Sequence, residues 1–401
     1  MSIYLIATLD TKGTEIRYVR TRLEALDLSV QVVDTGCLGE PAIAADISRE
    51  ELFRAAGASL EELRRLGDRG QAVTRAAEGA ARLISKLHAD GKVDGVLGIG
   101  GSAGTTIATA AMKALPLGVP KVMVSTLASG NVRGFVGDKD IVMINSVVDI
   151  LGLNRISRCV LSEAAHAIAG MVEHRMETSS SEDRPLVAAT MFGVTTPCVE
   201  KAREVLEAAG FEVLVFHATG NGGQAMESLI RDGEIAGVLD ITTTELADEI
   251  VGGVLSAGPD RLTAAARRGV PQVVSVGATD MVNFHGIDTV PGPFRARNLY
   301  KHNANVTLMR TTAEENARIG EEIGLKVSAS KGPAAIVLPG QGVSAIDRVG
   351  QPFDDPAARQ KLLAAVRDNA GDVEIIEKDM HINDPQFAVI AARKLTELIG
   401  K

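Results

Sequence analysis

The sequence contains no tryptophan, and aromatic residues make up only 3% of its 401 residues, although apolar residues reach 45%. The cores must therefore be built from Ala, Val, Leu and Ile, a composition that suits layered α/β folds. A chain of this length has material for about two or three domains with sizeable cores. A small disulfide-stapled scaffold is excluded.

Cysteine is also scarce. Cys37, Cys159 and Cys198 lie far apart and form no C-x-x-C pair. This usage predicts a reduced, cytoplasmic compartment. No spacing of His, Cys and Asp resembles a closed zinc site, so we expect no structural metal.

No run of like charge stands out along the chain. Lys and Arg number 42 against 51 Asp and Glu, which gives a net charge of −9. An acidic chain without a basic arm lacks the electrostatic footprint of a nucleic-acid-binding protein. We therefore expect no nucleic acid as a partner.

Long hydrophobic runs are missing as well. Residues 95–112 carry no charge, but their glycines predict a strand, a loop and a helix start rather than a membrane span. Residues 1–12 have no basic segment before their short apolar stretch, which Asp10 interrupts. They predict a strand and not a signal peptide, and we expect no membrane partner.

Short runs of Val, Ile and Leu alternate with longer amphipathic stretches, which is typical of parallel strands joined by crossover helices. The expected strands of the first half are residues 3–9, 30–34, 95–99, 121–125 and 141–145. Those of the second half are residues 186–191, 212–217, 237–241, 272–276, 306–310, 335–338 and 373–376. A linker rich in Glu, Ser and Thr is expected at residues 173–185. The sequence thus predicts an α/β protein with two Rossmann-like, doubly wound parallel-sheet subdomains, residues 1–180 and 185–401.

The two sets of strands match each other in order. Ile6-Ala7-Thr8 corresponds to Ala188-Ala189-Thr190, and Gly95-Val96-Leu97 corresponds to Gly237-Val238-Leu239. Chance similarity between two doubly wound domains is the alternative, but the kept order favours two similar halves. The first half is longer by about 40 residues between its second and third strands, which predicts a helical insertion at residues 39–69.

A glycine-rich loop follows the third expected strand. It reads Gly98-Ile99-Gly100-Gly101-Ser102-Ala103-Gly104-Thr105-Thr106 and precedes an Ala-rich helix. Glycines let the backbone approach an anion, and a helix N-terminus attracts negative charge. The loop fits neither the Walker A pattern nor, beyond a weak match, the dinucleotide fingerprint. It predicts a phosphate site, and the alternative is a tight turn without a ligand.

Other polar loops follow strands at the same edge of this sheet, where ligands of open α/β sheets bind. In Asp10-Thr11-Lys12 the lysine suits a phosphate, the threonine can donate to it, and the aspartate can hold Mg²⁺. An ordinary helix start is the alternative. Asp34-Thr35-Gly36 is a partner for a ribose or a base edge, and Thr126 lies in the polar loop after the fourth strand.

The second half carries its own loops. Asn221-Gly222-Gly223-Gln224 is suited to approach an anion or a carboxylate. Titratable side chains at strand ends and in one basic loop suit an enzyme that acts on a small carboxylate or phosphate metabolite between the subdomains. The candidate catalytic residues are Glu245, Arg295, Arg297, His302 and His381. For each of them a structural or solvated side chain is the alternative.

Several longer motifs resemble one known family. They are Asp10-Thr11-Lys12-Gly13, the glycine loop, residues 145–156, 240–248 and 302–312, and His381-Ile382-Asn383-Asp384-Pro385. Over essentially the whole chain they resemble the Tm-1-like ATP-binding domain family, in which the glycine loop usually has glycine where this chain has Ala103. A TIM-barrel-like domain that follows in a plant member is absent from this sequence.

The resemblance implies two Rossmann-like subdomains, a homodimer, and ATP bound with Mg²⁺ through its phosphates. Carried over to this sequence, the nucleotide site comprises Asp10, Thr11, Lys12, Gly100, Gly101, Ser102, Gly104, Thr105, Thr106 and Thr126. The first hypothesis is therefore a cytoplasmic ATP-binding protein. The alternatives are the metabolite enzyme described above and a module that binds a partner protein.

Overall fold

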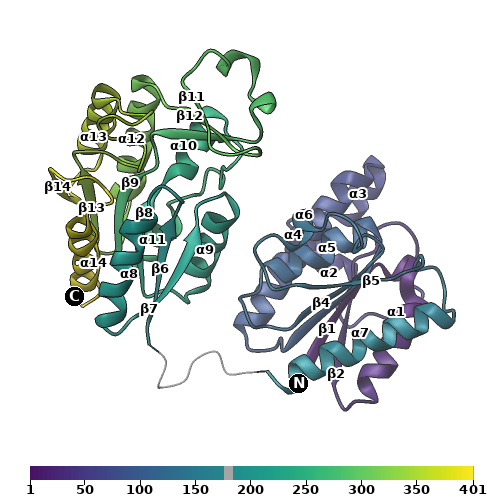
Figure 1. The fold of residues 1–401 in the computed structure, drawn as a ribbon. Coiled ribbons are helices and arrows are strands. Elements are labelled where there is room, and N and C mark those ends of the chain that lie inside the picture. Colours follow the sequence, from purple (N-terminus) through teal and green to yellow (C-terminus); the bar gives the residue numbers. More distant parts are fainter. Residues whose placement is uncertain (176–183, 401) are drawn as a thin grey trace. The chain divides into compact units, whose positions relative to one another are not determined.

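The computed structural model describes residues 1–175 and 184–400. The chain divides into two compact units, Met1–Ser180 and Ser181–Lys401, and each unit is a parallel sheet flanked by helices (Figure 1). The predicted fold class is thus confirmed. The linker expected at residues 173–185 falls largely on residues 176–183, outside the described residues.

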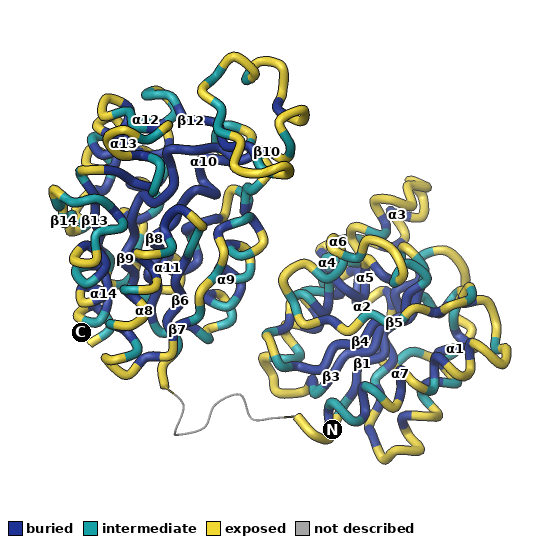
Figure 2. The backbone as a smooth tube through the Cα atoms, viewed as in Figure 1, coloured by how far each residue is buried: buried dark blue, intermediate teal, exposed yellow. Residues whose placement is uncertain are grey.

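The first unit is built on a five-stranded parallel sheet in the order β2-β1-β3-β4-β5. Its strands are β1 (Ser2–Ala7), β2 (Ser29–Asp34), β3 (Gly95–Gly100), β4 (Lys121–Ser125) and β5 (Val142–Asn145). All residues of β3 and β4 are buried, as expected for strands covered on both faces (Figure 2). Because β1 has β2 on one side and β3 on the other, the strand order reverses between β1 and β3.

Two layers of helices cover this sheet. The face with the core of Leu5, Leu97 and Val122 packs against α1 (Leu9–Glu24) and α7 (Arg155–Glu173). The other face packs against α2 (Arg49–Ala55), α3 (Leu60–Leu66), α4 (Arg69–Ala89) and α5 (Ser102–Lys113), and the short α6 (Arg133–Val136) precedes β5. Apolar stripes at helical spacing cause this packing. The start of α4 is fixed by the Asp68 side chain, which accepts a hydrogen bond from the Gln71 amide.

The second unit has a six-stranded parallel sheet in the order β14-β13-β9-β8-β6-β7. Its strands are β6 (Leu186–Met191), β7 (Glu212–His217), β8 (Gly237–Thr242), β9 (Gln272–Gly277), β13 (Ala334–Pro339) and β14 (Glu374–Lys378). One face packs against α8 (Thr196–Ala208) and α14 (Pro385–Ile399). The other packs against α9 (Asn221–Asp232), α10 (Thr244–Val251), α11 (Ala264–Arg268), α12 (Ala313–Ser328) and α13 (Pro356–Asn369).

The two sheets share a strand order, since β2-β1-β3-β4 in the first unit corresponds to β7-β6-β8-β9 in the second. The prediction of two similar halves is confirmed by this correspondence. Between β7 and β8 the second unit has only α9, whereas the first unit places α2, α3 and α4 between β2 and β3. The helical insertion predicted at residues 39–69 therefore contains α2 and α3.

One expected strand joins a different sheet. The run predicted at residues 306–310 forms β12 (Thr307–Arg310), which lies in a small antiparallel sheet between β10 (Met281–Phe284) and β11 (Leu299–Lys301). Two single-turn helices, η1 (Ile287–Thr289) and η2 (Gly292–Phe294), connect β10 to β11. A short apolar run signals a buried strand but does not say which neighbour it pairs with, and that is why the sequence misplaced it.

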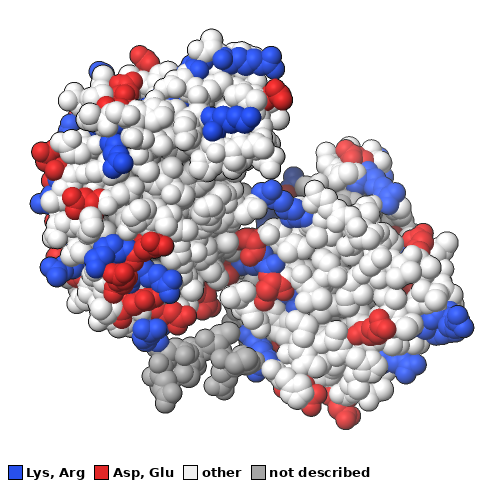
Figure 3. Space-filling view, in the orientation of Figure 1, with Lys and Arg blue, Asp and Glu red and all other residues white. Residues whose placement is uncertain are grey.

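Charged side chains of both signs are interspersed over the face of the molecule that Figure 3 shows, without a broad patch of one sign. In the described residues, no helix combines the length and the apolar character needed to cross a bilayer.

Candidate functional site

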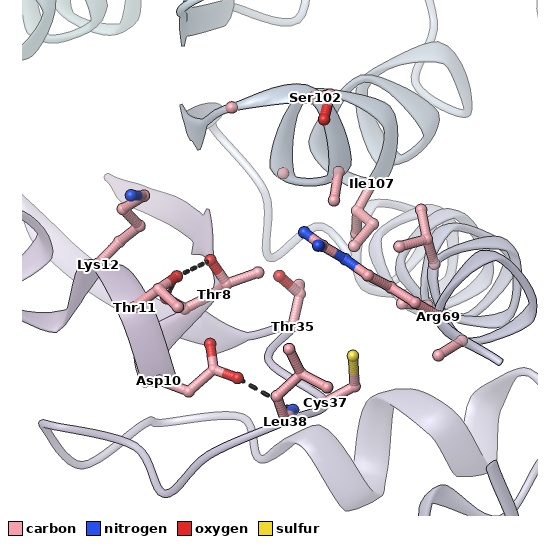
Figure 4. A pocket seen from close by; sticks show the side chains of 16 residues that line it. Thr8, Asp10, Thr11, Lys12, Thr35, Cys37, Leu38, Arg69, Ser102 and Ile107 are labelled. Atoms are coloured by element: carbon pink, nitrogen blue, oxygen red, sulfur yellow. Dashed lines mark hydrogen bonds between the residues drawn. The ribbon is translucent and has the colours of Figure 1, made fainter. Parts of the chain in front are cut away.

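A cavity of about 240 Å³ opens at the carboxyl end of the first unit's sheet, at the reversal between β1 and β3. The start of α1, the loop after β2, α4 and the start of α5 line it (Figure 4). Its lining residues are Thr8, Asp10, Thr11, Lys12, Thr35, Cys37, Leu38, Arg69, Ala72, Val73, Ala76, Gly101, Ser102, Ala103, Gly104 and Ile107. Open α/β sheets bind their ligands at this position.

The start of α5 faces this cavity without a cap. Gly101 is the N-cap residue, and no side chain accepts from the first turn. Within residues 1–175, the amides of Ser102, Ala103 and Gly104 donate to no protein acceptor. Gly100 brings the strand close to the helix, since a Cβ there would lie 2.7 Å from the Gly104 Cα. Free N–H groups and the positive end of the helix dipole thus point at one anion-sized space.

Asp10, which lines the same cavity, carries a carboxylate oxygen without a partner. Its Oδ2 accepts from the amides of Leu38 at 3.0 Å and Gly39 at 3.2 Å. Its Oδ1 is buried and has no hydrogen-bond partner. A buried, unpaired carboxylate oxygen is costly, and next to an anion it would also be repelled. A cation held between Asp10 and the anion removes both penalties.

Arg69, the first residue of α4, is a site residue that the sequence analysis missed. Its guanidinium extends into the cavity toward the start of α5 (Figure 4). No ion pair joins Arg69 to another residue of the described chain, so its charge is available to a ligand. It escaped notice because it ends the insertion, far in sequence from both predicted loops.

The start of α1 contributes the remaining polar groups, since Thr8 is its N-cap and Asp10, Thr11 and Lys12 lie in its first turn. Thr8 and Thr11 place their hydroxyl oxygens 2.8 Å apart at the cavity wall. Lys12 also lines the cavity, and its ammonium donates to the main-chain oxygen of Ile150. The structure therefore brings the predicted Asp10, Thr11 and Lys12 to the same space as the glycine loop.

Four predicted nucleotide-binding residues are absent from the cavity lining. Thr105 is fully buried, and its hydroxyl lies 2.7 Å from that of Ser125 in β4. Thr106 donates to the Ser102 carbonyl at 2.9 Å within α5. Gly100 belongs to β3 and accepts from the Thr126 amide at 3.4 Å. The Thr105 bond ties α5 to β4, and direct contacts of these four residues to a phosphate stay a prediction.

A second cavity, of about 300 Å³, adjoins the first through Cys37, Leu38, Arg69 and Ala72. Leu60 and Leu63 from α3 supply apolar walls, and Arg64 and Asp68 add polar groups. Burial raises the pKa of the Cys37 thiol, which therefore stays neutral. The insertion thus adds a space with apolar walls next to the first cavity.

The glycine loop of the second unit holds the protein's own carboxylate. The amides of Gly220 and Gly223 donate to Glu245 Oε1 at 2.6 and 3.1 Å, and Arg261 Nε donates to Oε2 at 2.6 Å. A Cβ on Gly223 would collide with this carboxylate. Burial raises the pKa of Glu245, against the lowering effect of Arg261. The anion expected at Asn221-Gly222-Gly223-Gln224 is therefore internal, and Glu245 is fully buried.

The basic loop of the second unit is partly neutralised within the chain. Arg297 donates to both oxygens of Glu315, at 3.0 and 2.7 Å, and this ion pair lowers the pKa of Glu315 although burial opposes it. Arg295 Nε donates to the Val290 carbonyl at 3.2 Å. His302 is exposed next to β11.

His381 is held by main-chain groups after β14. Its Nε2 lies 2.8 Å from the Ser344 carbonyl oxygen, and the Asn383 amide donates to Nδ1 at 3.1 Å. Burial lowers the pKa of His381, which favours the neutral ring. Within residues 184–400, no hydrogen bond or ion pair joins any two of the five predicted catalytic residues. Their catalytic roles stay predictions.

Fold and cavity together define a two-unit α/β protein whose first unit has a cavity at the reversal point of its sheet. Family models for the N-terminal and C-terminal domains of the uncharacterised protein family UPF0261 match residues 1–177 and 184–399. The chain therefore belongs to UPF0261.

Two relatives and one solved structure illustrate the similarity. A UPF0261 protein from Clostridium tetani is 50% identical, with 100% of this chain and 99% of the relative covered. The ToMV resistance protein Tm-1(GCR237) from Solanum lycopersicum is 40% identical over 100% of this chain and 56% of its own length, which confirms the predicted resemblance. A putative UDP-N-acetylglucosamine 2-epimerase from Listeria monocytogenes is 14% identical, covers 68% of this chain and 78% of its own, and has a TM-score of 0.25. That likeness is too weak to support any argument about function.

Proposed function

We propose that the first unit binds ATP together with Mg²⁺ in the cavity at the end of β1 and β3. The observation that carries the proposal is the pairing of the uncapped α5 start with the unpartnered Asp10 Oδ1 at one cavity. The helix start favours an anion, whereas the carboxylate oxygen requires a cation. A metal-bound phosphate supplies both charges.

The surrounding residues suit the rest of a nucleotide. Arg69 and Lys12 line the cavity as cations, and Thr11 and Ser102 add hydroxyl donors for phosphate oxygens. The second cavity adjoins the first and can receive a base between leucine side chains. The resemblance to the Tm-1-like ATP-binding domain family supports adenine as that base. The proposal concerns binding, and it assigns no hydrolysis step.

Replacing Arg69 with methionine should weaken ATP binding. The variant removes a cation that extends into the cavity and has no partner in the described chain. A charge-assisted hydrogen bond to phosphate corresponds to about tenfold or more in Kd. Isothermal titration calorimetry with ATP and Mg²⁺ measures the change. Arg65→Met, in the neighbouring α3 and outside the cavity lining, is the matched control and should bind like the parent. Equal affinities for both variants would place the nucleotide elsewhere.

Replacing Asp10 with asparagine should change the metal dependence of binding. The asparagine keeps an oxygen for the Leu38 and Gly39 amides but loses the negative charge at the unpartnered position. We expect affinity for Mg²⁺-ATP to fall about tenfold, and affinity for metal-free ATP to rise because a repulsive charge is gone. ATP titrations in the presence of Mg²⁺ and in the presence of EDTA test these opposite changes in affinity. The exposed Asp90 at the end of α4 supplies the control variant Asp90→Asn. A parallel loss under both conditions would contradict a metal role for Asp10.

The family resemblance also supports a cytoplasmic homodimer as part of this proposal. Light scattering on the purified chain would give its mass in solution, and a monomer at micromolar concentration would remove the dimer from the proposal.

A further inference from the structure

We propose that Lys12 couples nucleotide binding to the loop of residues 146–153, so that a bound phosphate draws the ammonium away from the loop and releases it. The inference rests on the proposed function and adds a regulatory step to the same site. Lys12 suits this role because it contacts both the cavity and the loop. It lines the cavity, and its ammonium donates to Ile150, which is 138 positions away in the sequence.

Few contacts hold the loop against α1. Besides the Lys12 bond to Ile150, the Gly152 amide donates to Glu15 Oε1 at 2.6 Å, and Glu15 is 1% exposed. The other hydrogen bonds of residues 147–151 are local. Two side-chain contacts from neighbouring turns of one helix therefore anchor the middle of the loop.

The loop has features of a segment poised to rearrange. Val147 adopts a φ of +64°, a left-handed conformation that is strained for a β-branched residue. Val147 and Leu151 are 68% and 77% exposed, whereas Ile150 is 2% exposed and packs in the core. Within residues 1–175, loss of the Lys12 bond would leave the bond from Gly152 to Glu15 as the remaining side-chain hydrogen bond between α1 and the loop.

A phosphate is the stronger partner for the ammonium. A phosphate presents full negative charge to the ammonium, whereas a main-chain carbonyl presents only a dipole, so the Coulomb attraction favours the phosphate. In Figure 4 the Lys12 ammonium lies at the edge of the cavity, on the side away from Arg69. To reach a phosphate at the start of α5 it must turn inward, and the bond to Ile150 is broken in that movement.

The absence of tryptophan allows a clean test. Leu151→Trp introduces a unique indole at an exposed loop position of the full chain. We expect its fluorescence to change as ATP and Mg²⁺ are added, with the same Kd that calorimetry gives. The double variant Leu151→Trp/Lys12→Met should show no change at saturating ATP. Amide exchange of the peptide spanning residues 146–154 should become about fivefold faster in the parent when ATP binds.

Arg69→Met is the control for loss of a cation from the cavity. In the Leu151→Trp background it should need more ATP but reach the full fluorescence change, because Arg69 does not contact the loop. Leu325→Trp, a half-exposed position in α12 of the second unit, should not respond. If Lys12→Met binds too weakly to saturate, its loop should still exchange about fivefold faster than the parent's without any nucleotide.

The outcomes separate this inference from the proposed function. ATP binding by calorimetry, with unchanged indole emission from the Leu151→Trp variant or slower exchange of the loop, overturns the coupling and leaves the nucleotide site intact. A full response in the Lys12→Met background also overturns it. No heat of binding with ATP and Mg²⁺ would instead reject the proposed function, and the coupling with it.

Discussion

Replacing Arg261 with methionine is expected to unfold the second unit of the protein. Arg261 is completely buried and donates to Asp240 at 2.5 and 2.7 Å and to Glu245 at 2.6 Å, with Glu227 at 3.5 Å. Burial alone would lower the pKa of Arg261, but these carboxylates hold it well above its usual value. Methionine fills much of the volume and leaves the carboxylates without a counter-charge.

Removal of one partner from a buried ion pair typically costs about 3–5 kcal/mol, and here several pairs are lost together. That loss is comparable to the whole stability of a typical domain. Calorimetry of the full chain, with amide exchange to identify the melting unit, should show loss of the transition of the second unit. Arg267→Met is the matched control, since its pair with Asp260 at 3.1 Å is largely exposed and should contribute little. A stable second unit in Arg261→Met would mean that the carboxylates take up protons at little cost.

Asp248 and Asp280 should each contribute less to the stability of the second unit as the pH rises from about 4 to about 7. Burial raises the pKa of Asp248 from 3.8 to about 7, against hydrogen bonds from Asn283 and Leu255, and burial also raises that of Asp280 to about 7. Between the unfolded and folded pKa values the folded unit binds protons that the unfolded chain does not. The contribution is therefore greatest at low pH and is lost as the pH rises through the folded pKa. For Asp248 the full loss is about 4 kcal/mol.

The substitution Asp248→Asn should remove the part of this pH dependence of stability that comes from residue 248. Asn283 currently donates its amide nitrogen to Asp248 at 2.6 Å, while its Oδ1 is buried without a partner. An asparagine at position 248, like a protonated aspartate, can donate to Asn283 Oδ1 once the Asn283 amide turns over. The variant thus resembles the low-pH form and satisfies an oxygen that is now unpaired.

We expect Asp248→Asn to match the parent at pH 5 and to exceed it in stability at pH 8 by several kcal/mol, up to about 4. Denaturant titrations at both pH values, with amide exchange of α10 as the local readout, measure the difference. Glu249→Gln changes the exposed neighbouring carboxylate and should leave the pH profile unchanged. A destabilised Asp248→Asn at pH 8 would show that the carboxylate is charged and well solvated in the fold.

The strands were predictable because buried parallel strands are near-continuous apolar runs, and the glycine loop because its composition is unusual for a plain turn. The place of Arg69 was not predictable, since it depends on how the insertion folds back over the sheet. Arg261 was equally hidden, because Gly258-Pro259-Asp260-Arg261 has the composition of a surface turn. Its burial follows from three carboxylates that only the fold brings together.

The glycine loops of the two units differ in what lies against them. In the second unit the anion is Glu245, a part of the chain, so that loop is occupied at every solution composition. In the first unit no side chain caps the start of α5, and under the proposed function a ligand from solution takes that place. A ligand that binds only the folded form adds stability in proportion to the logarithm of its concentration. If the proposed function holds, the stability of the first unit therefore rises with nucleotide concentration, whereas that of the second unit does not.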